Sequence, residues 1–176
     1  MKYLRSIILS AISSCSIICG CSKNNTNHIP AVENFKFQRY MGVWHEIARL
    51  PHSFERNIVD AQAEYTMLPD GRVRVVNRGE RDGKLTSITG VARPSGIQSI
   101  GELEVSFFYP FYSKYKIIYL DQDYQTAIVT SDSMDYFWIL SRKPQISREK
   151  LVDCLKKAQD WGFETKLLQY PNGLPQ

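Results

Sequence analysis

Residues 60–77 read DAQAEYTMLPDGRVRVVN, and this stretch decides the fold class. From residue 60 to residue 67 apolar and polar side chains alternate, a period of two that is typical of a strand with one buried face. Pro69-Asp70-Gly71 then supplies a tight turn. The alternation resumes directly after the turn, so the stretch predicts two antiparallel strands joined as a hairpin.

The same alternation recurs on both sides of this hairpin, separated each time by short turn sequences. Consecutive antiparallel strands at this spacing form either a sandwich or a barrel, and closure into a barrel removes the exposed edges. Eight strands also leave an interior for one small ligand. We therefore predict an all-β domain of eight antiparallel strands, in a sandwich or a closed barrel, with strands at residues 42–49, 60–67, 72–77, 84–92, 101–107, 114–120, 126–130 and 136–142.

After the last predicted strand the hydrophobic period changes from two to that of a helix. Ser147 is a suitable N-cap, and Gly162 suits the C-terminal stop. The pattern predicts one C-terminal α-helix packed outside the barrel, on which Cys154 is expected to be a buried small hydrophobe rather than a reactive thiol. Residues 165–170 are a possible ninth strand.

Composition bounds the function classes. The chain has 176 residues, of which 43% are hydrophobic, and a formal net charge of +4. This length fits one domain, and the composition excludes wholesale disorder. The scattered basic residues do not form the stripe that nucleic-acid binding requires. Aromatic residues are abundant, with 10 Tyr and 8 Phe, which favours a large apolar interior.

The N-terminus has the pattern of an export signal. Lys2 and Arg5 precede a charge-free apolar run at residues 7–18, which is shorter than the ~20 residues needed to span a bilayer. Ile18-Cys19-Gly20-Cys21 follows and resembles the lipobox of bacterial lipoproteins. That resemblance implies acyl chains on Cys21, removal of residues 1–20 and a lipidated tether at 21–34. An ordinary signal peptide that leaves an unmodified cysteine remains the alternative.

Three short motifs carry a family resemblance. They are Gly42-Val43-Trp44 in the first strand, Asp121-Gln122-Asp123-Tyr124 in a late turn, and Arg142 at the end of the last strand. In this order they resemble the lipocalin family, and in particular its bacterial outer-membrane lipoproteins and apolipoprotein D-like members. The resemblance implies an all-β, eight-stranded, up-and-down antiparallel β-barrel. It covers residues 35–171 and leaves 172–176 as a tail. His45 departs from the tyrosine usual in that group.

The strand order predicts where these residues lie. The first strand's start, the late turn and the last strand's end share one end of an up-and-down barrel, so Trp44 and Arg142 could stack there and close the base. The opposite end would be the mouth. There the aromatic run 107–112 would form a rim that acts as a loop-tip cluster, a ligand gate or a dimer surface. Basic residues are expected in the mouth loops or beside them, namely Arg49, His52, Arg56, Arg78 and Arg81.

Strand parity predicts the lining of the interior. Counting from Trp44 and Arg142, the inward set also includes Glu46, Ala48 and Tyr119. Most members are apolar with a few polar handles, as is common in small-molecule pockets. The residues predicted to contact a ligand are Tyr65, Val75, Asn77, Val105, Phe107, Tyr115, Ile117, Tyr136, Trp138 and Leu140.

These features favour a binding protein over an enzyme. The sequence has no nucleophile elbow, phosphate loop or paired histidine spacing, so we expect no catalytic residue, metal or cofactor. The resemblance implies an outer-membrane, lipid-anchored protein that carries a fatty acid, lysophospholipid or similar amphiphile. Two alternatives stay open. One is an enzyme acting on a hydrophobic substrate through Glu46 or Cys154, and the other is an interaction protein that forms a homodimer through its aromatic rim.

Overall fold

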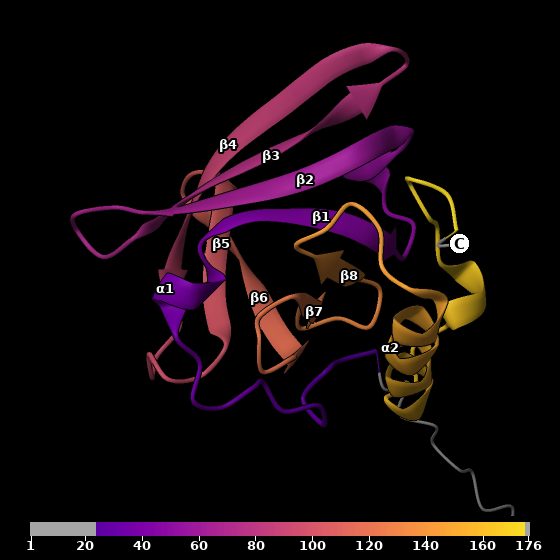
Figure 1. The fold of residues 1–176 in the computed structure, drawn as a ribbon. Helices are drawn as coiled ribbons and strands as arrows, with labels where there is room; N and C mark the ends of the chain where they lie inside the picture. The colour runs from indigo at the N-terminus through magenta and orange to yellow at the C-terminus, as the bar shows by residue number, and fades with distance from the viewer. Residues whose placement is uncertain (1–23, 175–176) are drawn as a thin grey trace, which may run out of the picture.

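The chain folds as a closed barrel of eight antiparallel strands, in a computed structural model that describes residues 24–174 (Figure 1). Each strand pairs with the next along the chain, and β8 pairs with β1 to close the barrel. The predicted fold class is thus confirmed. The strands are β1 Gly42–Arg49, β2 Ile58–Met67, β3 Val73–Arg81, β4 Lys84–Pro94, β5 Glu102–Phe108, β6 Phe111–Leu120, β7 Thr126–Thr130 and β8 Phe137–Ser141.

The barrel has two distinct ends. Because neighbouring strands are antiparallel, the β1–β2, β3–β4, β5–β6 and β7–β8 connections lie at one end, which we call the mouth. The other connections lie at the opposite end, the base. A short helix that the sequence did not predict, α1 Phe37–Tyr40, leads into β1 at this base. Figure 1 shows β2, β3 and β4 as long ribbons that reach well past the short β7 and β8.

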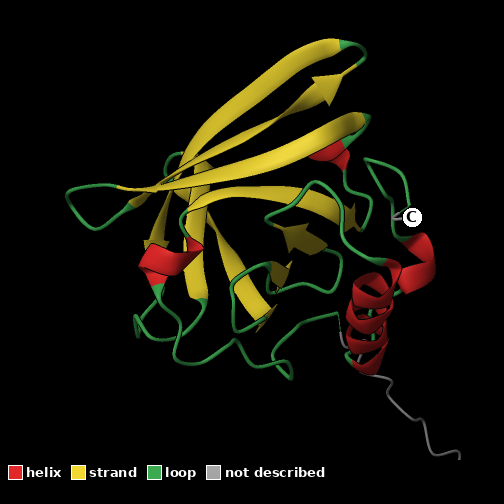
Figure 2. Ribbon diagram, in the orientation of Figure 1, coloured by secondary structure: helices red, strands yellow, loops and turns green. Residues whose placement is uncertain are grey.

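A single long helix, α2 Arg148–Asp160, packs against the outside of the barrel (Figure 2). The Ser147 hydroxyl accepts a hydrogen bond from the Lys150 amide at 3.2 Å, as expected of an N-cap. Cys154 is one of the helix residues that face the barrel, and it is fully buried, as predicted. No helix within residues 24–174 is long and apolar enough to cross a membrane.

Two hydrophobic clusters lie on either side of the barrel wall. The inner cluster fills the interior and includes Trp44, Tyr65 and Ile117. The outer cluster lies between the wall and α2 and includes Phe137, Ile139 and Cys154. Because α2 covers this part of the wall, β7 is buried along its whole length.

The predicted ninth strand is not formed. Residues Thr165–Leu167 make a 3₁₀ turn, and only Gln169 pairs with the sheet, through a single bridge to Arg49. The two backbone hydrogen bonds between Arg49 and Gln169 measure 3.0 and 2.8 Å. Leu168 and Tyr170 instead pack against the outer cluster.

The segment interpreted as a tether follows the barrel surface from residue 24 onward. We call residues 24–32 the strap, which Figure 1 shows in indigo running along the outside of the barrel between α2 and α1. Thr26 and Ile29 are fully buried in it. The Lys116 ammonium donates to the carbonyls of Thr26 and Ile29 at 3.0 and 3.2 Å, and the Val32 amide donates to Ile117 at 2.9 Å.

Two bulges overturn part of the predicted inward set. The register shifts between Glu46 and Ala48 in β1, and again between Ile117 and Tyr119 in β6. An extra residue in one strand reverses the parity of everything after it. Ala48 therefore belongs to the outer cluster, and Tyr119 packs against it.

Candidate functional site

Arg142 and Trp44 close the base of the barrel. The Arg142 guanidinium lies over the Trp44 ring at 4.0 Å from its centroid, as the sequence predicted. It also donates to the carbonyls of Val43, Arg39 and Tyr124 at 2.9, 2.8 and 3.2 Å. One side chain thus ties β1, α1 and the β6–β7 turn together.

The other motif residues, Gly42, Asp121 and Tyr124, shape the backbone and the turn at the base. Gly42 has a φ of +93°, a conformation that strains residues with a Cβ, and a Cβ there would meet Arg142 Nη1 at 3.4 Å. Asp121 shapes the turn by accepting from the Gln125 amide at 2.6 Å. Tyr124 lies beneath the Arg39 guanidinium, whose carbon is 4.1 Å from the ring centroid.

Above the base, three tyrosines form a hydrogen-bonded layer across the interior. The hydroxyls of Tyr40 and Tyr115 are 2.7 Å apart, and Tyr65 donates to Tyr115 at 3.0 Å. Burial raises the pKa of all three phenols, that of Tyr65 to about 12, so each stays protonated. Sequence parity found Tyr65 and Tyr115 but missed Tyr40, which lies in α1 before the first strand.

The wall above this layer is apolar, and it gathers most of the predicted lining. Gly90 on β4 leaves room for Phe107, because a Cβ at Gly90 would lie 2.7 Å from Phe107 Cδ1. Eight of the ten predicted lining residues belong to the inner cluster or pack against it: Tyr65, Val75, Val105, Phe107, Tyr115, Ile117, Trp138 and Leu140.

The remaining two predicted lining residues are Asn77, which is polar, and Tyr136, which lies at the mouth. Asn77 shares the parity of Val75 on β3 and pairs with Ala63, which packs against the inner cluster. Its side-chain oxygen is buried without a hydrogen-bond partner in residues 24–174. Tyr136 lies at the mouth, where its ring stacks on Trp138 at a centroid distance of 6.1 Å.

A buried charged network lies beneath the mouth. The Arg49 guanidinium donates to Glu46 at 2.5 Å and to the carbonyls of Glu55 and Ile58 at 3.0 and 2.9 Å. The Glu55 carboxylate in turn lies 2.9 Å from His52 Nε2 and accepts from the Trp138 indole at 3.2 Å. We call these five side chains, Glu46, Arg49, His52, Glu55 and Trp138, the mouth network.

The two carboxyl groups of the mouth network, Glu46 and Glu55, have pKa values that are shifted in opposite directions. Desolvation and the nearby Glu55 charge raise the pKa of Glu46 to about 8, against the opposing effect of Arg49. Desolvation would also raise the pKa of Glu55, but hydrogen bonds and charge from His52, the Trp138 indole and Arg49 lower it overall. The network therefore holds one ionised and one largely protonated carboxyl near neutral pH.

Two of the predicted mouth cations are not available to a ligand. The β1 bulge turns Arg49 inward, where it is buried and paired with Glu46. Arg78 points off the outer wall and donates to Glu64 at 2.6 Å. The expected ring of cations thus loses two of its five members, while Arg56 and Arg81 are exposed. Simple alternation could not place Arg49, because the bulge breaks it within Glu46-Ile47-Ala48-Arg49.

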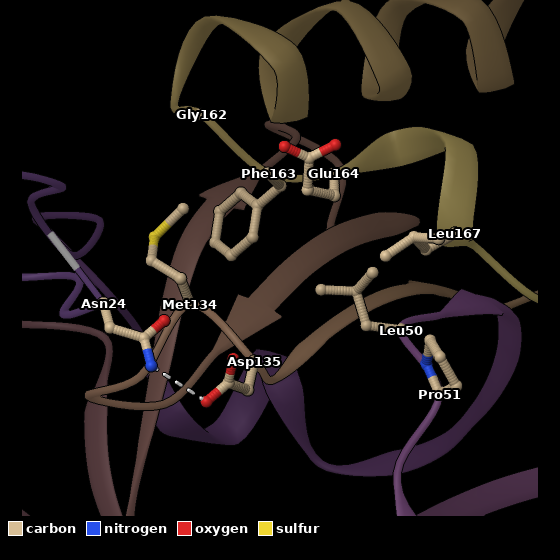
Figure 3. A pocket seen from close by; sticks show the side chains of 9 residues that line it. All are labelled: Asn24, Leu50, Pro51, Met134, Asp135, Gly162, Phe163, Glu164 and Leu167. Carbon is tan, nitrogen blue, oxygen red and sulfur yellow. Dashed lines mark hydrogen bonds between the residues drawn. The ribbon is translucent and has the colours of Figure 1, made fainter. Parts of the chain in front are cut away.

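A separate groove lies outside the barrel, close to the mouth (Figure 3). Its volume is about 310 Å³, and Asn24 and Asp135 form one side of it with a hydrogen bond of 3.3 Å. Figure 3 shows Met134, Phe163 and Leu50 around the hollow and Glu164 above it. The groove lies between the start of the strap, the β7–β8 loop and the segment after α2.

Cys154 does not reach the barrel interior. Cys154 belongs to the outer cluster, away from the interior, and burial raises its pKa to about 11. Within the described residues, no three His, Cys, Asp or Glu side chains are grouped so that they could hold a metal ion.

Comparison with known proteins agrees with this geometry. The profile of the family described as "Lipocalin-like domain" matches residues 35–173. The chain is 38% identical over 164 residues to the outer membrane lipoprotein Blc of Citrobacter freundii, covering 92% of this chain and 93% of the relative. Blc of Escherichia coli K12 is 37% identical and covers 89% of this chain and 90% of its own.

More distant relatives share the fold. Bovine apolipoprotein D is 35% identical over 137 residues, covering 71% of this chain and 70% of the relative. Insecticyanin from the tobacco hornworm superposes with a TM-score of 0.69 at 18% identity, over 82% of this chain and 84% of that structure. The chain belongs to the lipocalin family, and within it resembles the bacterial outer membrane lipoproteins.

Proposed function

We propose that this protein carries a fatty acid, lysophospholipid or similar amphiphile in its barrel. The observation that carries this proposal is the inner cluster: an apolar wall closed at the base by Trp44 and Arg142 and bounded at the other end by a polar network. An apolar barrel interior with a few polar groups at one end matches a molecule with an apolar tail and a polar head.

The tail would lie against the upper part of the inner cluster. Trp138 is only partly buried and lies between the interior and the mouth, so it is placed to contact the first part of the chain. Each Å² of apolar surface removed from water contributes about 25 cal/mol before ordering costs. The path follows Tyr65, Val75, Val105, Ile117, Trp138 and Leu140.

The head group would meet polar groups rather than a ring of cations. The unpaired Asn77 oxygen accepts hydrogen bonds only, and the Arg49 charge already faces the Glu55 carboxylate, 3.9 Å from Arg49 Nε. A neutral or zwitterionic head with hydroxyl donors suits this lining better than a bare carboxylate. Among the amphiphiles considered, a lysophospholipid therefore fits best.

The anchor part of the proposal rests on the sequence. Cys21 lies outside the described residues, and its acylation is inferred from the lipobox pattern. The relatives named outer membrane lipoproteins support this inference and an outer-membrane location. Several acyl chains on one residue give stable attachment, where a single chain would be marginal.

Ligand titration of the chain that begins at Ser22 tests the pocket. We expect palmitoyl lysophosphatidylethanolamine to change tryptophan fluorescence, and the change to disappear in Trp138→Phe but to persist in Trp161→Phe. Trp161 is the matched control because it caps α2 on the outside of the barrel.

A second pair of variants tests whether the tail lies inside. Val75 and Val76 are neighbours on β3, but Val75 is buried in the inner cluster and Val76 has the opposite parity. Val75→Arg places an unpaired charge on the tail path and should weaken binding at least tenfold, whereas Val76→Arg should not. If a folded Val75→Arg protein binds as tightly as the parent, the tail does not lie in the barrel.

A further inference from the structure

The strap begins at the mouth of the barrel, fixed to the β7–β8 loop. The Met134 amide donates to the Asn24 carbonyl at 3.0 Å, and the Thr26 amide donates to Asp132 at 3.2 Å. Asn25 forms a bridge with Ser133, and Thr26 is fully buried. These contacts hold the start of the strap at one place on the molecule.

This position limits where a lipid on Cys21 could be. Only three peptide steps separate Asn24 from Cys21, and an extended chain spans at most ~3.6 Å per residue, or about 11 Å in all. The membrane in which Cys21 is anchored must therefore approach the mouth end of the barrel. This step depends on the proposed acylation of Cys21.

The β5–β6 hairpin supplies a second, independent observation at the same end. Its tip carries Phe108, Tyr109 and Phe111, which are 72%, 84% and 78% exposed. Leu85, at the start of β4 on the neighbouring mouth hairpin, is 92% exposed. Single exposed apolar residues are ordinary, but three large aromatic ones at a single hairpin tip are not.

The chemistry of this tip fits a membrane surface. Aromatic side chains, tyrosine in particular, favour the boundary between hydrocarbon and head groups, where one end of the ring is apolar and the other wet. We propose that the mouth end docks on the bilayer that holds the Cys21 anchor, with the β5–β6 tip inserted at its surface. A lipid could then pass between the bilayer and the barrel without crossing bulk water.

A spin-label experiment on the full, acylated protein in vesicles tests this orientation. The vesicles contain phosphatidylethanolamine and phosphatidylglycerol, and a nitroxide is attached at Phe108→Cys. Because Cys154 is fully buried and Cys21 is acylated, the introduced thiol can be labelled selectively. The matched control is Ile97→Cys, an exposed apolar residue on the β4–β5 connection at the base.

We expect vesicles to raise the ratio of oxygen to nickel-chelate collisions severalfold at position 108 and to leave it unchanged at 97. A label at Leu85→Cys gives an independent reading if the first variant fails to fold. Equal, water-like ratios at both ends, in protein that floats with the vesicles, would overturn the docking. Dipolar broadening between two 108 labels would assign the tip to a second copy of the chain instead.

The same experiment distinguishes failure of the Cys21 anchor from failure of the interior pocket. Protein that does not float with the vesicles lacks the anchor, and the docking proposal falls with it. Loss of lysophospholipid binding with the 108-to-97 difference intact would support docking and count against the interior pocket alone.

Discussion

Arg142 holds several segments together at the base of the barrel. Its guanidinium lies over Trp44 and satisfies three backbone carbonyls from three separate segments. All of these contacts are at the base, below the tyrosine layer that separates it from the wall assigned to the ligand. We therefore expect its loss to change folding much more than binding.

Arg142→Ala should lower the free energy of unfolding by about 1–3 kcal/mol, through lost stacking and lost packing of the side-chain stem. The measurement is denaturant unfolding, with the exposed neighbour Lys143→Ala as control. An unchanged midpoint combined with lost lipid binding would contradict a structural role and move Arg142 to the ligand site.

Glu46 gives the mouth network a pH dependence. Its folded-state pKa is raised to about 8 from an ordinary value near 4.5, so the folded protein binds a proton that the unfolded chain releases. This contribution to stability is present below about pH 4.5 and is lost as the pH rises toward 8. The lowered pKa of Glu55 acts in the opposite sense at more acidic pH.

We expect the unfolding free energy to fall between about pH 5 and pH 8, and Glu46→Gln to flatten that slope. Urea titrations at several pH values measure it, and Glu104→Gln on the outer wall is the control. A slope that survives in Glu46→Gln would show that another group titrates in this range.

At the scale of elements, the sequence predicted the strands and the long helix, which have a regular hydrophobic period. It missed the bulges, α1 and the strap, which are set by tertiary contacts. All eight strands and α2 follow from alternation, helical spacing and turn residues. The bulges in β1 and β6 leave little trace in composition, yet they decide that Arg49 faces inward and Tyr119 outward. Likewise α1 and the strap are too short to show a period, and they are placed by contacts with distant strands.

The strap should depend on Lys116, whose ammonium bonds two of its carbonyls. Lys116→Met leaves those buried carbonyls without a donor and should cost about 1–3 kcal/mol. Hydrogen exchange at residues 26–29 and cleavage by protease should both become faster. Lys114→Met, on the same strand but exposed, is the control, and equal protection in both variants would contradict this role.

At the scale of the whole molecule, attachment and folding should be separable. Cys21→Ser should abolish acyl labelling and release the protein from membranes, since the residues described here contain no membrane-spanning helix. Fractionation and metabolic labelling measure this, and the barrel's thermal unfolding should not change. Label that stays in Cys21→Ser would show that another residue carries the anchor.

The pairing of β1 with β8 also constrains how the chain is made. These strands are joined by hydrogen bonds, but about ninety residues separate them along the chain, so their contact carries a high loop-closure cost and should form late in folding. Until β8 is available, β1 and β7 both present unpaired edges that can recruit other chains. A chain truncated before residue 137 should therefore aggregate rather than fold into a smaller barrel.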